Sequence, residues 1–371
     1  MKIGIITLYG EDNYGNKLQN YALKKILEKF SQDVETIKLD LIENKTIKYY
    51  CNKFTIKLFF RYIFLKVIGL NRKIKNINRK KTMKEFSNQN LNVKGYRLTK
   101  EEFNSLNVIY DKLVIGSDQV WNHNFVRKML DWYFVIFSPK DKNIAYSASF
   151  GIDEIEDELK DQYIKGLNNM SYISVREEQG AKIVKDLIKK DVPVLVDPTM
   201  LLSIEEWNKI IKSPKHLPKN KYILTYFLGN YSSERKENIY NFAKKNNIDV
   251  INLARLEYKK YYAKSPGEFI WYIKNASIII TDSFHGTVFS LLYKVPFYTM
   301  NREDKTQSMS SRIDTLLKMF NFEERLINDN KFDMNFNCNF NNVNVVLNSE
   351  KKRSFDYLSK AFELKENYIE N

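Results

Sequence analysis

The stretch that decides the fold is SIIITDSFHGTVFSLLYKVPF, residues 277–297. Its first residues are a short run of β-branched and apolar side chains, which predicts a buried strand ending at Thr281. A polar turn follows, and an apolar stretch from about Gly286 predicts a helix that covers the strand. The last residues, VPF, open another strand. A strand, a helix and a further strand in this order are typical of a parallel α/β sheet.

The same alternation extends over most of the chain. Before residue 200 the apolar runs are KIGIITL, VETIKL, NVIYDKLVIGS, NIAYSAS, YISVRE and VPVLVD, with amphipathic segments between several of them. A second series contains KYILTYFL, DVINLA, SIIITD and VPFYTM. Residues 201–220 carry two prolines among polar residues and predict a linker. We therefore predict an α/β protein whose two Rossmann-like domains, residues 1–200 and 221–371, face a cleft.

Composition argues against several classes of protein. The 371 residues are 43% hydrophobic with only 12 Gly and 7 Pro, which fits a globular chain rather than a disordered or fibrous one. Two cysteines and three histidines lie far apart, so we expect no disulfide framework, no metal and no cofactor. No run of 18 uncharged apolar residues occurs, and the N-terminal apolar run meets acidic residues early. We therefore expect a cytoplasmic protein.

Positive charge is concentrated in one segment. The net charge is +15, and residues 45–84 contain thirteen Lys or Arg and no Asp or Glu. Lys53, Lys57 and Arg61 follow one another at four-residue steps among aromatic and aliphatic residues, so a helix here would carry a basic stripe beside an apolar face. This pattern favours contact with an anionic membrane surface. A core-packed helix with a lysine-rich exposed side is the alternative, and nucleic acid ranks last because no recognition motif accompanies the charge.

Ligands of parallel α/β domains bind at the carboxyl ends of strands, so polar residues directly after strands are the candidates for a site. Ser283, Phe284, His285 and Gly286 occupy such a place. Free N–H groups and the positive end of the dipole at a helix start favour an anion, which His285 would face. A structural hydrogen bond is the alternative role for this histidine.

Three other strand ends carry candidate residues. Arg176 follows a strand and offers a planar guanidinium that matches a carboxylate or a phosphate, unless it pairs with Glu177. The turn after KLVIG suits a sugar ring, although an Asp turn beside a buried tryptophan would look the same. Its candidates are Ser117, Asp118, Gln119, Trp121 and Asn122. The loop after the first strand lacks the GxGxxG fingerprint and contributes Asp12, Asn13, Tyr14 and Asn16.

Seven segments stand in the order found in a known family. They are NYGNKLQNYAL, VIGSDQVWN, YSASFG, SVREEQGAKIV, VDPTMLL, EFI with IIITDSFHGTVFSLLYKVPF, and SRIDTLL. Over about residues 1–320 the chain thus resembles the polysaccharide pyruvyl transferase family. The resemblance implies a GT-B-like fold and transfer of pyruvate from phosphoenolpyruvate to two hydroxyls of a sugar, which forms a ketal and releases phosphate.

The resemblance implies that Arg176 and His285 bind the donor. The chemistry of ketal formation then predicts that His285 is the catalytic acid or else the cation that stabilises the phosphate, and that Asp118 or Asp12 is the base. The donor, phosphoenolpyruvate, would bind in the second domain and at Arg176. The donor residues would be Arg176, Ser283, Phe284, Gly286 and Arg312. The acceptor residues would be Asp12, Asn13, Tyr14, Asn16, Ser117, Gln119, Trp121 and Asn122. Some members have Arg-Leu-His where this chain has Ser283-Phe284-His285, so Arg312 or Arg302 is expected to supply the missing charge.

The implied acceptor is a sugar of a cell-surface glycan, such as an exopolysaccharide or cell-wall polymer, or its lipid-linked precursor. The basic insertion 45–84 would then hold the enzyme at the inner face of the membrane as a peripheral protein. Two other functions stay open. A GT-B glycosyltransferase would place the diphosphate of a nucleotide sugar at the same helix start. A membrane-surface protein that binds glycans without turnover would keep the fold alone.

Overall fold

The computed structural model describes residues 1–10, 13–42, 77–255, 259–262, 264–302, 311–327 and 333–363. The first sheet has six parallel strands in the order β3-β2-β1-β4-β5-β6. They are β1 (Lys2–Ile6), β2 (Asp33–Leu41), β3 (Val93–Leu98), β4 (Lys112–Asp118), β5 (Asn143–Ala148) and β6 (Tyr172–Val175). β1 and β4 are almost completely buried because helices cover both faces of the sheet.

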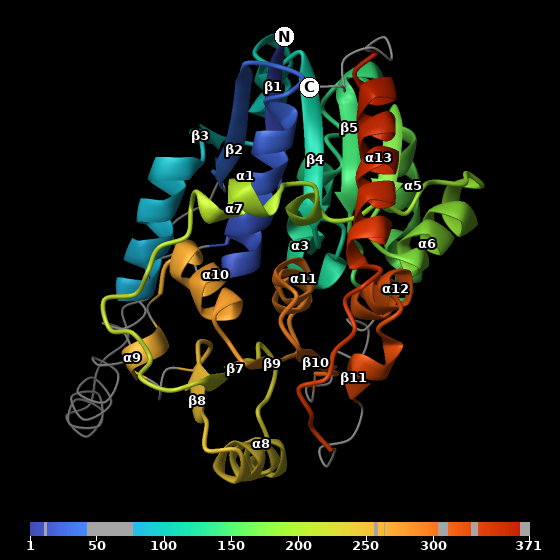
Figure 1. Cartoon of the computed structure of the whole chain (residues 1–371). Helices are drawn as coiled ribbons and strands as arrows, with labels where there is room; N and C mark the ends of the chain where they lie inside the picture. The colour runs from blue at the N-terminus through green and yellow to red at the C-terminus, as the bar shows by residue number, and fades with distance from the viewer. Residues whose placement is uncertain are drawn as a thin grey trace, which may run out of the picture.

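The second sheet has five parallel strands in the order β11-β10-β9-β7-β8. They are β7 (Tyr222–Tyr226), β8 (Asp249–Asn252), β9 (Ile278–Thr281), β10 (Phe297–Met300) and β11 (Leu326–Ile327). Two parallel sheets with their own helices confirm the predicted two-domain α/β fold (Figure 1). The predicted strand VPVLVD forms only one isolated bridge, between Val175 and Val194. Pro193 limits further pairing because it has no N–H to donate.

Helices connect the strands of both sheets. In the first half they are α1 (Tyr14–Leu27), residues 77–90, α3 (His123–Val126), α4 (Leu130–Tyr133), α5 (Lys160–Asn168), α6 (Glu178–Ile188) and α7 (Ile204–Asn208). In the second half they are α8 (Ser233–Lys245), α9 (Lys259–Tyr262), α10 (Pro266–Lys274), α11 (Phe284–Tyr293), α12 (Ser311–Phe320) and α13 (Val343–Ala361). Short 3-10 turns, including η5 (Pro198–Met200), complete the described elements. Several helices start with a side-chain cap, as α1 does at Asn13.

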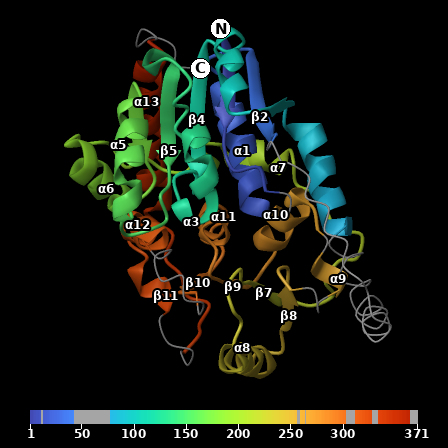
Figure 2. The ribbon, with the colours of Figure 1, turned by 180° about the vertical axis from the view of Figure 1, so that it is seen from behind.

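The last helix corrects the predicted domain boundary. Residues 221–371 were expected to form one domain, but α13 packs on the first sheet beside β5 (Figures 1 and 2). The Tyr357 hydroxyl donates to the Ala145 carbonyl at 2.8 Å, and Phe362 stacks on Phe30. The apolar side of α13 is thus buried against the first domain, and the chain crosses between the domains twice.

Aromatic rings and one arginine join the two domains. Tyr14, at the start of α1, is fully buried and stacks on Phe269 of α10, with ring centroids 4.5 Å apart. Arg79 lies 4.5 Å from the Tyr14 ring and donates from Nη1 to the carbonyl of Leu253 in the second domain. Burial raises the pKa of Tyr14, so this hydroxyl stays neutral.

Most of the basic insertion, including Lys53, Lys57 and Arg61, lies outside the described residues. The described residues of the insertion, 77–84, belong to the helix 77–90. The exposed side of this helix carries lysines, and Arg79 is buried. In the part of the chain that the structure covers, no helix is both long and apolar enough to span a bilayer.

The domain contact predicts the effect of one added methyl group. Gly15, in the first turn of α1, lies against the His285 ring of α11, and a Cβ there would overlap Nδ1, Cε1 and Cγ of the imidazole. Although alanine suits a helix better than glycine, we expect Gly15→Ala to lower the free energy of unfolding by about 1–3 kcal/mol through overpacking. Denaturant unfolding measures this change.

Gly95→Ala is the matched control, because a Cβ at Gly95 in β3 has no neighbour within 4 Å. Its free energy of unfolding should change by less than about 0.5 kcal/mol. Equal stability of both variants, with the imidazole unmoved, would show that the two domains do not meet at this contact.

Candidate functional site

The candidate site lies where the carboxyl ends of the two sheets meet. Ser117 and Asp118 end β4, and Arg176 directly follows β6. From the second domain, Phe284 and His285 form the first turn of α11, which follows β9. Strands of both domains therefore deliver their terminal residues to one place, as expected for parallel sheets.

His285 is the second residue of α11, whereas the sequence pattern predicted that it precedes the helix. α11 begins at Phe284, two residues earlier than expected, because Ser283 is its N-cap. The Ser283 Oγ accepts from the Gly286 N–H at 3.3 Å, so this amide is engaged within the turn. Ser283 thus occupies one of the amides at the helix start, and the anion site at this helix start stays a prediction. Gly286 itself packs closely: a Cβ there would lie 2.7 Å from the Thr281 hydroxyl.

The imidazole of His285 is held between the two domains. The residue is only 6% exposed, and Gly15 packs against its ring. Its Nε2 lies 3.7 Å from Asp197 Oδ2 and has no hydrogen-bond partner in the described part of the chain. The Nε2 of His285 therefore lies near a carboxylate but is not used in a hydrogen bond among the described residues.

Arg176 is almost fully buried, and only part of its hydrogen-bonding capacity is used by the described residues. Its Nη1 donates to Asp197 Oδ2 at 2.8 Å, and Nη2 lies 3.7 Å from Asp118 Oδ1. The guanidinium carbon stands 4.3 Å from the centroid of the Phe284 ring, in a cation–π contact. Nε and Nη2 are buried without a hydrogen-bond partner among the described residues. A buried guanidinium in this state fits a ligand with anionic oxygens.

Asp118 is placed by the end of β4. Its backbone has φ 73°, a left-handed conformation that non-glycine residues seldom adopt. The side chain accepts from Asn16 of α1 and from the Gln119 N–H. These bonds fix the carboxylate beside Arg176.

Asp197 is a second carboxylate of the site and is almost completely buried. It accepts from Ser117 Oγ at 2.6 Å, from Arg176 Nη1, and from the N–H and hydroxyl of Thr199. Burial alone would raise the pKa of Asp197, but the attraction of His285 and Arg176 and the bond from Ser117 hold it well below its usual range. Asp197 therefore stays ionised at every physiological pH.

Two further arginines lie near the cluster. Burial and the neighbouring charge of Arg176 lower the pKa of Arg312 to about 9, although Glu177 and Asp118 oppose this shift. The buried Nε of Arg312 has no partner among the described residues. Arg302 lies 3.9 Å from Asp282, a carboxylate that also accepts from two backbone N–H groups of the loop after β7. Burial raises the pKa of Asp282.

Several predicted acceptor residues serve the scaffold. Trp121 is fully buried between Phe134 and Phe150 and has no free ring face for a sugar. Asn122 caps α3, as Asn13 caps α1. We therefore leave Trp121, Asn122 and Asn13 out of the acceptor site, together with the interdomain Tyr14. Asp12 lies outside the described residues.

Gln119 remains a candidate because its buried Nε2 has no hydrogen-bond partner in the described chain. It packs against Gly151, whose φ of 58° and lack of a side chain leave room for the amide. Glu177 shapes this turn: its Oε1 accepts from Ser149 Oγ and from the N–H groups of Phe150 and Gly151.

Buried side chains with unused hydrogen-bond donors therefore gather around the carboxylates of Asp118 and Asp197. This arrangement can bind a small polyanion, move a proton through an imidazole and stabilise a leaving group. Among the described residues no group of three His, Cys, Asp or Glu could hold a metal ion.

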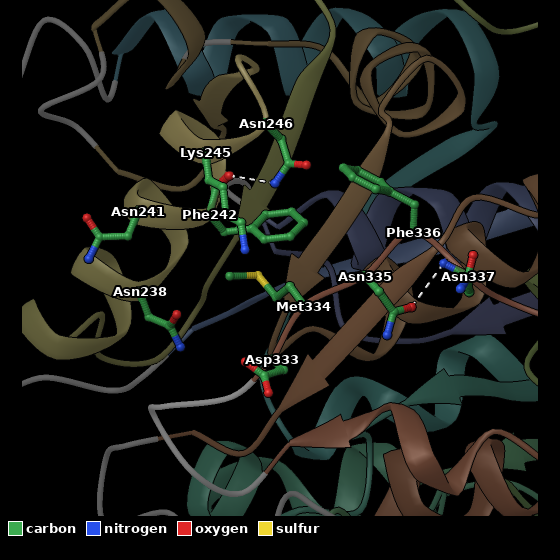
Figure 3. A pocket seen from close by; sticks show the side chains of 10 residues that line it. All are labelled: Asn238, Asn241, Phe242, Lys245, Asn246, Asp333, Met334, Asn335, Phe336 and Asn337. Carbon is green, nitrogen blue, oxygen red and sulfur yellow. Dashed lines mark hydrogen bonds between the residues drawn. The ribbon is translucent and has the colours of Figure 1, made fainter.

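A cavity of about 510 Å³ lies elsewhere, at the end of the second domain remote from the first sheet (Figures 1 and 3). It is lined by Asn238, Asn241, Phe242, Lys245 and Asn246 at α8 and by residues 333–337. All its lining residues are exposed or only partly buried. We place the function at the buried cationic cluster, because unpaired buried charge needs a ligand and solvated amides do not.

Three residues of the site were missed from the sequence. Asp197 follows an apolar run, so the rule that sites lie after strands could have identified it. Glu177 was read only as a partner of Arg176, and its contacts with the turn at 149–151 depend on tertiary structure. The role of Gly15 could not be predicted from the sequence, because it depends on contact with His285 of the other domain.

The lowered pKa of Arg312 predicts a stability effect. Because the folded pKa of about 9 lies below the unfolded one, folding disfavours the proton. This penalty is full at pH 7 and fades only as the pH rises above about 9. We expect Arg312→Met to stabilise the ligand-free protein by at least about 1 kcal/mol at pH 7, measured by denaturant unfolding.

Phosphate should raise the melting temperature of the wild type and have less effect on Arg312→Met, since ligand binding to the folded state stabilises it. Lys318→Met, which removes an exposed charge from the same helix, is the control and should match the wild type in both measurements. A destabilised Arg312→Met protein would show that Arg312 is already neutralised without a ligand.

Comparison with solved structures finds distant similarities. UDP-GlcNAc 2-epimerase from Methanocaldococcus jannaschii is 14% identical, with a TM-score of 0.47 over 100% of this chain and 96% of that one. The enzyme from Rickettsia bellii is 12% identical, with a TM-score of 0.46 over 98% and 97%. Likenesses of this size say nothing about the activity of this chain.

Sequence comparison is more informative. A search of curated proteins gave no match. A family model described as polysaccharide pyruvyl transferase matches residues 13–304, a range that includes Arg176, Asp197 and His285. Since the match covers most of the chain, the protein belongs to the polysaccharide pyruvyl transferase family, a family of transferases.

Proposed function

We propose that the protein transfers pyruvate from phosphoenolpyruvate to two hydroxyls of a sugar, forming a ketal and releasing phosphate. The observation that carries this proposal is a set of buried atoms on Arg176, Arg312 and His285 that have no hydrogen-bond partner within the described residues. A carboxylate and a phosphate on one small molecule would satisfy these donors together. Family membership supports a transferase, and the donor and the ketal are our own inference.

Each cation would have a separate task. The guanidinium of Arg176 matches the planar carboxylate or two phosphate oxygens of the donor. Arg312, charged at pH 7 despite its lowered pKa, would donate to a phosphate from Nε, which has no partner among the described residues. It would replace the arginine that other members carry where this chain has Ser283. His285 lies beside Asp197, as Arg176 does, and its Nε2 would be available to the donor.

The reaction begins with protonation of the donor. His285, held as an imidazolium by the donor's negative charge, gives a proton to C3, and the methylene becomes a methyl group. One sugar hydroxyl then adds to C2 and loses its proton to Asp118. The second hydroxyl displaces phosphate from C2 and closes the ketal. Of the two hydroxyl protons, one balances the proton added to C3 and the other leaves with the phosphate.

The acceptor would enter from the first domain. Asp118, Asn16 and Gln119 present oxygen and nitrogen atoms to hydroxyls on this side of the cluster. We propose a cell-surface glycan, or its lipid-linked precursor, as the source of the sugar. The basic segment 45–84 would bring the enzyme to the inner face of a membrane where such precursors are anchored.

The direct test uses the donor itself. Isothermal titration should show that phosphoenolpyruvate binds and that UDP and GDP do not. Phosphate release from phosphoenolpyruvate, measured against a panel of cell-wall and capsular sugars, should depend on one acceptor. Tight binding of a nucleotide without phosphoenolpyruvate binding would favour a nucleotide-sugar glycosyltransferase. Glycan binding without phosphate release would favour a non-catalytic relative.

His285→Gln tests the proton donor. Glutamine keeps a polar side chain but cannot be protonated, so kcat for phosphate release should fall about 10²-fold to 10⁴-fold. His123→Gln is the matched control: His123 lies in α3 beside Glu156, outside the cluster, and its loss should leave kcat unchanged. Near-normal turnover of His285→Gln would remove the acid role from this residue.

Charge reversal tests the membrane proposal. The triple change of Lys53, Lys57 and Arg61 to Glu should abolish co-sedimentation with phosphatidylglycerol vesicles, since each basic residue contributes about 1 kcal/mol at such a surface. Phosphatidylcholine vesicles should bind neither protein. A control triple, with the exposed Lys182, Lys190 and Lys212 changed to Glu, alters the net charge equally. If the two triple variants bind phosphatidylglycerol vesicles equally well, segment 45–84 is not a membrane anchor.

A further inference from the structure

Asp197 lies between the two proposed donor-binding side chains without being placed to bind the donor. It follows the apolar run 192–196, which lies beside β6 through the Val175–Val194 bridge. It also caps the short helix η5. Its side chain is 0% exposed, so no solvent screens its charge.

The two oxygens of Asp197 have different partners. Oδ1 accepts from the N–H of Thr199 at 3.0 Å and from its hydroxyl at 2.6 Å, both in the turn that Asp197 itself begins. Oδ2 accepts from Ser117 at 2.6 Å and from Arg176 at 2.8 Å, and it lies 3.7 Å from His285 Nε2. One oxygen is thus anchored to the backbone, and this anchor fixes where the other oxygen lies.

This geometry orients the cations without using all their donors. Arg176 gives one of its three donor nitrogens, Nη1, to Asp197, and its Nε and Nη2 have no hydrogen-bond partner in the described segments. At 3.7 Å the imidazole of His285 is near Oδ2 but not hydrogen-bonded to it, so Nε2 likewise has no partner there. A carboxylate would repel an anionic donor, and its value to binding must therefore lie in how it holds its neighbours.

We propose that Asp197 is the positioning residue that holds the Arg176 guanidinium of the first domain and the His285 imidazole of the second toward one donor molecule. This inference rests on the proposed function. It adds a residue that joins the two halves of the site through a single oxygen.

Asp197→Asn is the first test. The amide keeps the shape and an acceptor for Thr199, but its NH₂ group cannot accept from Arg176. Positioning of this kind is typically worth about 10-fold to 100-fold in activity. We expect kcat for phosphate release to fall by at least about 10-fold, and the KM for phosphoenolpyruvate to change less, because orientation acts in the transition state.

A control variant distinguishes a loss of positioning in the site from a general loss of stability. Tyr357→Phe removes a partly buried hydrogen bond to Ala145, between α13 and β5 and outside the cluster. It should lower the melting temperature and leave kcat intact. If Asp197→Asn also loses only stability, and the folded enzyme keeps wild-type kcat, the proposal is overturned.

A ligand-free crystal structure of Asp197→Asn tests the same proposal without any substrate. Arg176 and His285 should leave the positions that they hold in the wild type, and unchanged positions would refute the role of Asp197. If the wild type fails to bind phosphoenolpyruvate, the proposed function fails, and this structural comparison still decides whether Asp197 holds the pair.

A second variant covers the case in which Asp197→Asn does not fold. Thr199→Val removes only the hydroxyl that anchors Oδ1 and keeps the side-chain volume. It should lower kcat several-fold, less than full loss of the carboxylate. Wild-type kcat in this variant, with Asp197 displaced in its crystal structure, would also count against the proposal.

Discussion

A buried carboxylate that must be neutralised from two sides organises the centre of this protein. Removing an ionised group from water costs several kcal/mol unless partners replace the lost hydration. Asp197 finds these partners in Ser117 and Arg176 of its own domain and in His285 of the other. The closed arrangement of the two domains and the geometry of the site therefore depend on the same charge.

The side chains of the site consequently come from several elements. Arg176 follows β6, His285 lies in α11 and Arg312 lies in α12, while Ser283 engages the amide of Gly286 at the start of α11. Gly15 matters in this arrangement because the imidazole can reach the first domain only where α1 has no side chain. A ligand with two separated anionic groups would complete the hydrogen bonding of Arg176, Arg312 and His285 together.

Local patterns in the sequence predicted much of the fold. The run 277–297 predicted β9, α11 and β10, and similar runs predicted most strands of both sheets, because parallel strands are apolar on both faces. β3 was missed since its residues alternate between polar and apolar at the edge of the sheet. The destination of α13 was also missed, because no local pattern states which sheet a distant helix will cover.

The site was predictable where function follows from position in a strand. Arg176, Asp118 and His285 were identified because each ends or follows a buried strand. Trp121 illustrates the limit: a ring beside polar residues suits a sugar or a core equally, and only its burial between Phe134 and Phe150 decides. The chemistry of Asp197 depends on residues 80 positions before it and 88 after it, Ser117 and His285.

The return of α13 to the first domain has a mechanical consequence. With two chain crossings rather than one, the second domain cannot swivel freely about a single tether. Removing α13 would also leave the side of β5 that faces Tyr357 open to water.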